Sequence, residues 1–208
     1  MRKILYIGKI GPFPNFHAKL KPGETVVDLG TGTGDLYLLA YPNVQPGGKV
    51  IGADISANML SIARERLSRD LNCEPDLRLL SAECTGLESE SVDVVMMGWS
   101  LRNIGDRPKV YREILRILRP GGRFVCIETS QPDFVLTRWS NAIYVRFVMP
   151  NLAFLCGGNR EGYLYLTGSA EHFPRPAALA DEWGQAGFRN TKSKPLMFGA
   201  IAIHQGWK

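Results

Sequence analysis

At 208 residues, with 45% hydrophobic and 22% charged residues, the chain has the size and balance of one globular domain with a substantial core, which excludes a second full domain. Its formal net charge of +5 comes from Lys and Arg residues that stand singly or in pairs, which argues against a nucleic-acid-binding stripe and is compatible with an anionic membrane surface. The cysteines Cys73, Cys84, Cys126 and Cys156 form no C-x-x-C pair and have no His at metal-ligand spacing, so we expect reduced, mostly buried thiols and no metal site.

The first residues begin with basic side chains like a signal peptide, but Lys9, Pro12 and Pro14 interrupt the apolar stretch too early for one. No run of about 20 apolar residues occurs in the sequence, which excludes a membrane-spanning helix. The sequence therefore predicts a cytoplasmic protein and leaves peripheral contact with a membrane open.

Short β-rich runs alternate with helical patterns from Thr25 to Glu128. The predicted strands are Thr25 to Leu29, Lys49 to Asp54, Leu77 to Ser81, Val92 to Met97 and Arg123 to Glu128. This alternation is typical of a parallel sheet with helices on both faces.

Two helical patterns between these strands begin at the capping residues Ser56 and Asp106. The first predicts a helix with one apolar face made of Met59, Ala63 and Leu67. The second predicts a helix that carries Val110, Ile114, Ile117 and Leu118 and ends at Pro120-Gly121-Gly122, which leads into the fifth strand.

The alternation breaks after Glu128. Residues 133 to 156 are rich in aromatic side chains and contain Arg138 and Arg146, which predicts a cap insertion over about 133–175. Such a cap would either cover an isoprenoid chain with its arginines at lipid headgroups or pack as a helix on the core. A helix from about Pro176 to Ala186 and a hairpin of two runs, 190–197 and 200–206, close the chain.

The predicted architecture is therefore a single α/β domain over residues 1–208. Its core is a Rossmann-like, seven-stranded, mostly parallel sheet with an antiparallel C-terminal hairpin strand, and a helical cap is added to it.

Three glycines stand at alternate positions after the first predicted strand: Gly30, Gly32 and Gly34. Such glycines let the backbone turn tightly and lie against a ligand without a Cβ clash, before a helix begins. Asp54 closes the next strand, where a carboxylate accepts hydrogen bonds from ribose hydroxyls. The dinucleotide fingerprint needs a glycine at position 35, which is Asp35 here, so the spacing favours S-adenosylmethionine over NAD.

Beyond this turn the chain carries an ordered set of short segments. They are Asp28-Leu29-Gly30-Thr31-Gly32-Thr33-Gly34-Asp35-Leu36, Gly52-Ala53-Asp54-Ile55-Ser56 with Met59-Leu60, Ala82-Glu83, Leu101-Arg102-Asn103-Ile104, Arg119-Pro120-Gly121-Gly122-Arg123, Glu128-Thr129-Ser130-Gln131-Pro132, Tyr163-Leu164-Tyr165-Leu166, Phe173-Pro174 and His204-Gln205-Gly206-Trp207-Lys208. In this combination, over about Thr25 to Lys208, the chain resembles the ubiquinone and menaquinone biosynthesis C-methyltransferases, which methylate a ring carbon of a prenylated quinol. The Leu-Arg-Asn, Glu-x-Ser-x-Pro, Tyr-x-Tyr-Leu and Gly-Trp-Lys pieces are the specific ones, whereas the glycine turn is shared among methyltransferases.

The resemblance implies S-adenosylmethionine as cofactor, S-adenosylhomocysteine as its product, a prenylated quinol as substrate, and no metal. The cofactor-binding residues that it implies are Asp28, Gly30, Thr31, Gly32, Gly34, Asp54, Ile55, Met59, Ser81, Ala82, Glu83 and Trp99. The substrate-binding residues are Glu128, Tyr163, Tyr165 and Ser169, and the catalytic pair is Arg102 and Asn103.

An aromatic carbon accepts a methyl group readily only after a neighbouring hydroxyl is deprotonated. Arg102 would stabilise the resulting oxyanion and Asn103 would orient the hydroxyl or a water; the alternative is that Arg102 forms a surface ion pair or caps a helix. Glu128 either relays a proton or anchors the cap. Among the histidines, His204 is expected to be structural, and His17 and His172 are candidate bases without a placed role.

Two departures from the family pattern stand out. About two dozen residues precede Thr25, where the family has a longer helical segment with a Tyr-Asp pair, and Ser81 stands where the family has an Asp that accepts from the adenine amino group. A hydroxyl accepts such a bond more weakly than a carboxylate. Either the cofactor is bound loosely, or a partner or lipid completes the site, or catalysis is lost.

The leading hypothesis is S-adenosylmethionine-dependent C-methylation of a demethylated menaquinol or ubiquinol. The alternatives are another small aromatic or amine acceptor, a catalytically silent cofactor-binding homologue and, least favoured, an NAD dehydrogenase. The oligomeric state is left open by the sequence.

Overall fold

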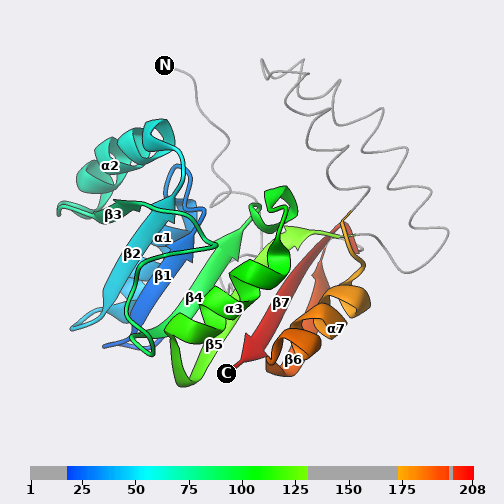
Figure 1. The fold of residues 1–208 in the computed structure, drawn as a ribbon. Coiled ribbons are helices and arrows are strands. Elements are labelled where there is room, and N and C mark those ends of the chain that lie inside the picture. The colour runs from blue at the N-terminus through cyan, green and yellow to red at the C-terminus, as the bar shows by residue number, and fades with distance from the viewer. Residues whose placement is uncertain (1–17, 131–172, 197–198) are drawn as a thin grey trace, which may run out of the picture.

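The computed structural model describes residues 18–130, 173–196 and 199–208, and its centre is one seven-stranded sheet with the order β3-β2-β1-β4-β5-β7-β6 (Figure 1). Its strands are β1 (Thr25–Leu29), β2 (Lys49–Asp54), β3 (Asp76–Leu79), β4 (Val92–Gly98), β5 (Leu118–Thr129), β6 (Arg189–Leu196) and β7 (Ile201–Trp207). The helices are α1 (Asp35–Val44), α2 (Ala57–Leu71), the 3-10 turn η2 (Leu101–Asn103), α3 (Arg107–Ile117) and α7 (Pro176–Ala186).

Strands β1 to β5 are all parallel, and β7 runs antiparallel to both β5 and β6. The predicted mostly parallel sheet with a C-terminal antiparallel hairpin is therefore confirmed. The chain moves outward from β1 to β3 on one side and then returns to β4 on the other side of β1. Ligands of such sheets bind at the carboxyl ends of the strands where the order reverses, here at β1 and β4.

Helices cover both faces of the sheet because apolar side chains alternate along its strands. In β1, Val27 packs in the cluster that contains residues of α3 and α7, whereas Val26 packs with residues of α1 and α2. Figure 1 shows α3 and α7 in front of the sheet and α1 behind it. The strands are consequently held between two apolar layers, which fixes the positions of their ends.

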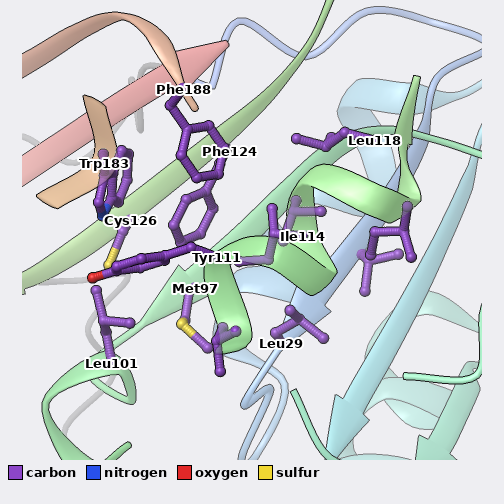
Figure 2. Packing of buried hydrophobic residues seen from close by; sticks show 14 of the residues in the cluster. Leu29, Met97, Leu101, Tyr111, Ile114, Leu118, Phe124, Cys126, Trp183 and Phe188 are labelled. Atoms are coloured by element: carbon purple, nitrogen blue, oxygen red, sulfur yellow. The ribbon is translucent and has the colours of Figure 1, made fainter. Parts of the chain in front are cut away.

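An aromatic cluster anchors α3 and α7 to β5, as Figure 2 shows. The rings of Phe124 and Trp183 stack with centroids 4.4 Å apart, and Tyr111 meets Trp183 edge-on at 6.2 Å. All three side chains are at most 1% exposed. Aromatic pairs of this kind contribute about 0.5–1.5 kcal/mol beyond the burial of their area.

Three sequence predictions about helix faces, helix ends and cysteine burial need correction. Met59 is 41% exposed, and the buried face of α2 is made of Leu60, Ala63 and Leu67, because the helix is rotated so that Leu60, one residue further along the same turn, faces the core. Leu118 is not helical: α3 ends at Ile117, and Leu118 caps it in an extended conformation and pairs with Val92 as the first residue of β5.

The third correction concerns the thiols that we expected to be mostly buried. Among the described cysteines, Cys126 is buried, Cys73 is half-buried and Cys84 is exposed. Cys84 lies in the connection between β3 and β4 rather than in a strand or helix, and exposure is usual in such connections. Cys156 lies outside the described residues, as does the predicted cap apart from residues 173–175.

None of the helices in the described part of the chain combines the length and the apolar character that crossing a membrane requires.

Candidate functional site

The glycine turn predicted from the sequence joins β1 to α1 at the carboxyl edge of the sheet. Gly30, Gly32 and Gly34 have φ values of +71°, +55° and +87°, in the left-handed region that favours glycine. A Cβ at Gly30 would lie 2.7 Å from the Ser100 Cβ, and one at Gly34 would lie 2.8 Å from Leu67, whereas one at Gly32 would meet no atom within 4 Å. Two glycines therefore allow close packing, and the third leaves its backbone open to a ligand.

Neighbouring elements hold this loop in place. The Gly30 and Thr31 N–H groups donate to the Ala53 carbonyl at 2.7 and 2.9 Å. From α2, Arg66 donates to the Thr33 carbonyl at 3.2 Å and pairs with Asp35 at 2.7 Å. The turn is thus preorganised by β2 and α2 before any ligand arrives.

Asp54 ends β2 beside the loop, as the sequence predicts. Its Oδ2 accepts from the Gly32 N–H and its Oδ1 from the Ser56 N–H, both at 2.9 Å. Each oxygen of a carboxylate has capacity for a second hydrogen bond, so a ribose hydroxyl can still be accepted. The next residue, Ile55, is 77% exposed, and Met59 follows on α2, so apolar surface adjoins the carboxylate.

Asp28 lies beneath the loop and is 1% exposed. The Thr31 hydroxyl donates to its Oδ2 at 2.6 Å, while Oδ1 has no hydrogen-bond partner in the part of the chain that the structure describes. Burial raises the pKa of the Asp28 carboxyl from 3.8 to about 7, and the hydrogen bond from Thr31 opposes that rise only in part. A buried acceptor without a partner fits a ligand that brings a positively charged amine.

The segment Ser81-Ala82-Glu83 follows β3, which ends at Leu79 rather than at Ser81 as predicted. The Leu80 N–H donates to the Asp54 carbonyl at 3.1 Å, which places this segment next to the carboxyl end of β2. The Ser81 hydroxyl accepts from the Glu83 N–H at 3.2 Å. The Glu83 carboxylate pairs with Lys109 of α3 at 3.2 Å, so the structure gives it a contact that the sequence did not predict.

Arg102 and Glu128, which are 26 residues apart in the chain, meet at the same edge. The Arg102 guanidinium forms an ion pair with Glu128, and their side chains are 4% and 0% exposed. Glu128 also accepts from the Arg102 backbone N–H at 3.2 Å and from the Thr129 N–H at 2.8 Å. The alternative of a surface ion pair at Arg102 is therefore wrong, because this pair is buried.

Two further predicted residues flank this pair. Asn103 is exposed in η2, and its N–H donates to the Ser100 carbonyl at 3.1 Å. Trp99 is half-buried and has a φ of +58°, which is strained for a bulky residue, and its N–H donates to the Ile127 carbonyl at 3.0 Å. Strain of this kind is found where the surrounding structure fixes a side chain for function.

His204 lies in β7 and is 2% exposed. Its Nδ1 is 2.7 Å from the Ser193 hydroxyl, and burial lowers the pKa of the ring to about 4. These contacts support its expected structural role. Tyr163, Tyr165, Ser169, His17 and His172 lie outside the described residues, so their roles stay predictions.

Sequence reasoning missed two residues that hold the glycine loop, namely Arg66 and Ser100. A charged residue beside the buried face of a predicted helix, as Arg66 is beside Leu67, is the sequence signal that indicates such a contact. The closeness of Ser100 to Gly30 depends on the parallel pairing of β1 with β4, for which the sequence carries no such signal.

Comparison with known proteins gives matches along nearly the whole chain. A model of the ubiE/COQ5 methyltransferase family matches residues 13–208. The demethylmenaquinone methyltransferase of Symbiobacterium thermophilum is 38% identical over 197 residues, which cover 90% of this chain and 77% of that protein. The enzyme of the same name from Oceanobacillus iheyensis is 38% identical over 191 residues, which cover 91% of this chain and 79% of that protein.

Solved structures share the fold at lower identity. A SAM-dependent methyltransferase from Aquifex aeolicus has a TM-score of 0.66 and 18% identity, covering 92% of this chain and 85% of that one. A SAM-dependent methyltransferase from Thermotoga maritima has a TM-score of 0.64 and 20% identity, covering 94% of this chain and 88% of that one.

Proposed function

This chain belongs to the ubiE/COQ5 methyltransferase family, and from that premise we propose that it methylates a ring carbon of a demethylated, prenylated menaquinol. It is an S-adenosylmethionine-dependent methyltransferase. The observation that carries the choice of substrate is the 38% identity, over 90% of the chain, to a relative named for demethylmenaquinone.

The residues at the carboxyl edge fit the cofactor. When bound, S-adenosylmethionine supplies an electrophilic methyl group on a sulfonium sulfur and leaves as S-adenosylhomocysteine. The open backbone at Gly32 and the unpartnered oxygen of Asp28 would hold its amino acid portion, and Asp54 would accept from its ribose hydroxyls. Ile55 and Met59 offer apolar surface for its base.

Arg102 and Glu128 would prepare the quinol. Arginine stays protonated at any working pH, so Arg102 serves as a fixed cation that stabilises the phenolate form of the ring. Glu128 holds that cation in a buried position and in one orientation. Asn103, exposed beside them, would orient the quinol hydroxyl or a water that removes its proton.

A methyl-transfer assay with radiolabelled S-adenosylmethionine tests this proposal. Reduced demethylmenaquinone should be methylated on its ring carbon, and reduced demethylubiquinone and an unprenylated naphthalenediol serve as competing acceptors. Faster methylation of reduced demethylubiquinone than of reduced demethylmenaquinone would make a ubiquinol, and not a menaquinol, the substrate. Activity confined to unrelated aromatic or amine acceptors would overturn the substrate, and tight cofactor binding without turnover on any acceptor would favour a silent homologue.

We also propose that the enzyme works in the cytoplasm and meets its prenylated substrate at an anionic membrane surface. The support is the net charge of +5 together with the apolar tail of such a substrate. Flotation with anionic and with zwitterionic liposomes checks this. Binding to anionic vesicles that disappears in high salt is expected, and equal absence of binding to both at low salt would contradict it.

A further inference from the structure

Helix α3 holds the connection between β3 and β4 through three side chains. Lys109 pairs with Glu83 at 3.2 Å. One turn later Glu113 accepts from Thr85, and in the last turn Arg116 donates to the Leu87 carbonyl at 2.7 Å. The connection between a short edge strand and β4 is therefore fastened to a helix rather than left as a free loop.

The central contact is the most buried of the three. Glu113 Oε1 accepts from the Thr85 N–H at 2.7 Å and from the Thr85 hydroxyl at 2.6 Å. Arg116 Nε donates to Glu113 Oε2 at 2.8 Å. The Glu113 side chain is 11% exposed and Thr85 is 5% exposed. Arg116 and Thr85 together hold the pKa of Glu113 down at about 2, so the carboxylate stays charged at working pH.

The order of the strands shows which part of the cofactor lies near this contact. The glycine turn follows β1 and Asp54 ends β2, so a ligand that spans both extends in the direction of β3, the next strand outward. The Leu80 N–H donates to the Asp54 carbonyl at 3.1 Å, which brings Ser81 and Ala82 beside the ribose position. The base carried by that ribose would then rest against Ser81 and Ala82.

Thr85 is four residues beyond Ser81 and is joined to it by a short chain of contacts. The Cys84 N–H donates to the Ser81 carbonyl at 3.2 Å, and the two residues form an isolated β-bridge. The Ser81 hydroxyl also accepts from the Glu83 N–H at 3.2 Å. Fixing Thr85 on α3 therefore fixes the position of Ser81 and Ala82.

We propose that Thr85 and Glu113 are positioning residues for the cofactor, which set its affinity by holding Ser81 and Ala82 against its base. The proposal rests on the proposed function only in that S-adenosylmethionine is the cofactor, and it does not depend on the identity of the methyl acceptor. Neither residue touches the reacting atoms, so they act on binding and leave the chemical step unchanged.

Calorimetry with S-adenosylhomocysteine and with methylthioadenosine tests the proposal on the full chain. Thr85→Val keeps the shape of the side chain and removes its hydroxyl, and we expect it to weaken both ligands by the same factor, up to about 10-fold, because the lost charge-assisted hydrogen bond acts on the ligand only through Ser81 and Ala82. Thr85→Ser restores the hydroxyl and should bring the affinity within about twofold of wild type. Glu113→Gln should weaken both ligands as Thr85→Val does.

Glu182→Gln is the matched control, because Glu182 of α7 holds the same helix α3 through Arg107, at 3.1 and 2.9 Å, without touching the connection. It should lower the melting temperature and leave both affinities unchanged. Unchanged affinity in Thr85→Val, or an equal loss of affinity in Glu182→Gln, would overturn this proposal and leave the cofactor assignment intact. Wild-type protein that fails to bind S-adenosylhomocysteine would overturn the cofactor assignment and this proposal with it.

Discussion

The two edges of the sheet use their polar residues in opposite ways. The amino edge is the one at which the parallel strands begin. There the Arg123 side chain of β5 donates to both oxygens of Glu24 at 2.8 and 2.9 Å and to the Lys19 carbonyl at 2.8 Å. At the carboxyl edge Asp28 keeps an oxygen without a partner among the described residues, and Ile55 is 77% exposed.

This contrast separates the contacts that serve folding from those that serve the reaction. Paired polar groups at the amino edge close the ends of the strands and leave little capacity for a ligand. Unpaired acceptors, exposed apolar side chains and the strained Trp99 at the carboxyl edge cost stability, and they persist where a ligand supplies what is missing. Substitutions at the amino edge should therefore change unfolding alone, and those at the carboxyl edge should change binding or turnover as well.

The two arginine–glutamate pairs, Arg102 with Glu128 at the carboxyl edge and Arg123 with Glu24 at the amino edge, give the largest expected effect. Arg102→Ala leaves the fully buried Glu128 without its cation and should cost about 3–5 kcal/mol of unfolding free energy. It should also lower turnover by about 100-fold or more, since a fixed cation at the phenolate is lost. Arg123→Ala should cost less, because Glu24 is 14% exposed and regains water, and it should leave kcat unchanged.

Urea unfolding and steady-state kinetics below the transition compare the two variants. Where Arg102→Ala is too unstable to assay, Arg102→Lys keeps the charge and loses the planar fork, and its kcat should still fall. A loss of kcat in Arg123→Ala equal to that in Arg102→Ala would show that both pairs act through folding.

The pH dependence of stability gives the next effect. Because the pKa of Asp28 is raised from 3.8 to about 7, the folded protein holds a proton that the unfolded chain releases. The stability from this residue is fully present below about pH 4 and is lost as pH rises to about 7, a change of about 4 kcal/mol at 1.4 kcal/mol per pH unit.

Asp28→Asn isolates this contribution, since the amide does not titrate in this range. The difference in unfolding free energy between wild type and Asp28→Asn should therefore change between pH 4 and pH 7 and be constant above it. The same variant should bind S-adenosylhomocysteine more weakly, because it loses the negative charge that would pair with the ligand's ammonium group. A constant difference from pH 4 to pH 8 would show that Asp28 is charged in the free protein.

A smaller effect separates two aspartates, one at each edge. Asp54→Ala should weaken binding of S-adenosylhomocysteine by about 1–3 kcal/mol, as for a lost buried hydrogen-bond partner. Asp93 at the amino edge accepts from the Thr25 N–H at 2.8 Å and pairs with Arg119 at 2.6 Å. Asp93→Ala should lower stability and leave that affinity unchanged. Titration calorimetry with S-adenosylhomocysteine on both variants and wild type measures the difference. Unchanged affinity in Asp54→Ala would place the ribose elsewhere.

Sequence patterns were sufficient for the carboxyl edge wherever the signal is local. The glycine turn, Asp54 at the end of β2 and the capping residue Ser56 each depend on a few consecutive residues, and the structure has them where the spacing predicts. The helix expected from about Pro176 to Ala186 is α7, because proline favours the first turn and Gly187 adopts the left-handed conformation that ends it.

Contacts between distant segments could not be predicted in this way. The pairing of Arg102 with Glu128 needs the parallel register of β4 and β5, and that of Thr85 with Glu113 needs α3 to lie across the connection after β3. Met59 was assigned to the buried face because helical spacing alone does not give the rotation of a helix relative to the sheet. The sequence therefore predicts which residue types gather at an edge better than it predicts their partners.

The smallest expected effect on stability and binding comes from two glycines at opposite edges of the sheet, both with left-handed backbones and open space at the Cβ position. Gly23, before β1, and Gly32, after it, have φ values of +85° and +55°, and a Cβ at either would meet no atom within 4 Å. Gly23→Ala and Gly32→Ala should therefore each cost about 1 kcal/mol of unfolding free energy, from the left-handed backbone alone. At Gly32 the added methyl would also occupy the open space beside the loop backbone, so binding of S-adenosylhomocysteine should weaken by about 10-fold while Gly23→Ala binds like wild type. Equal affinities in the two variants would mean that the ligand does not approach the loop at Gly32, and the contrast between the edges would then depend on Asp28 and Asp54 alone.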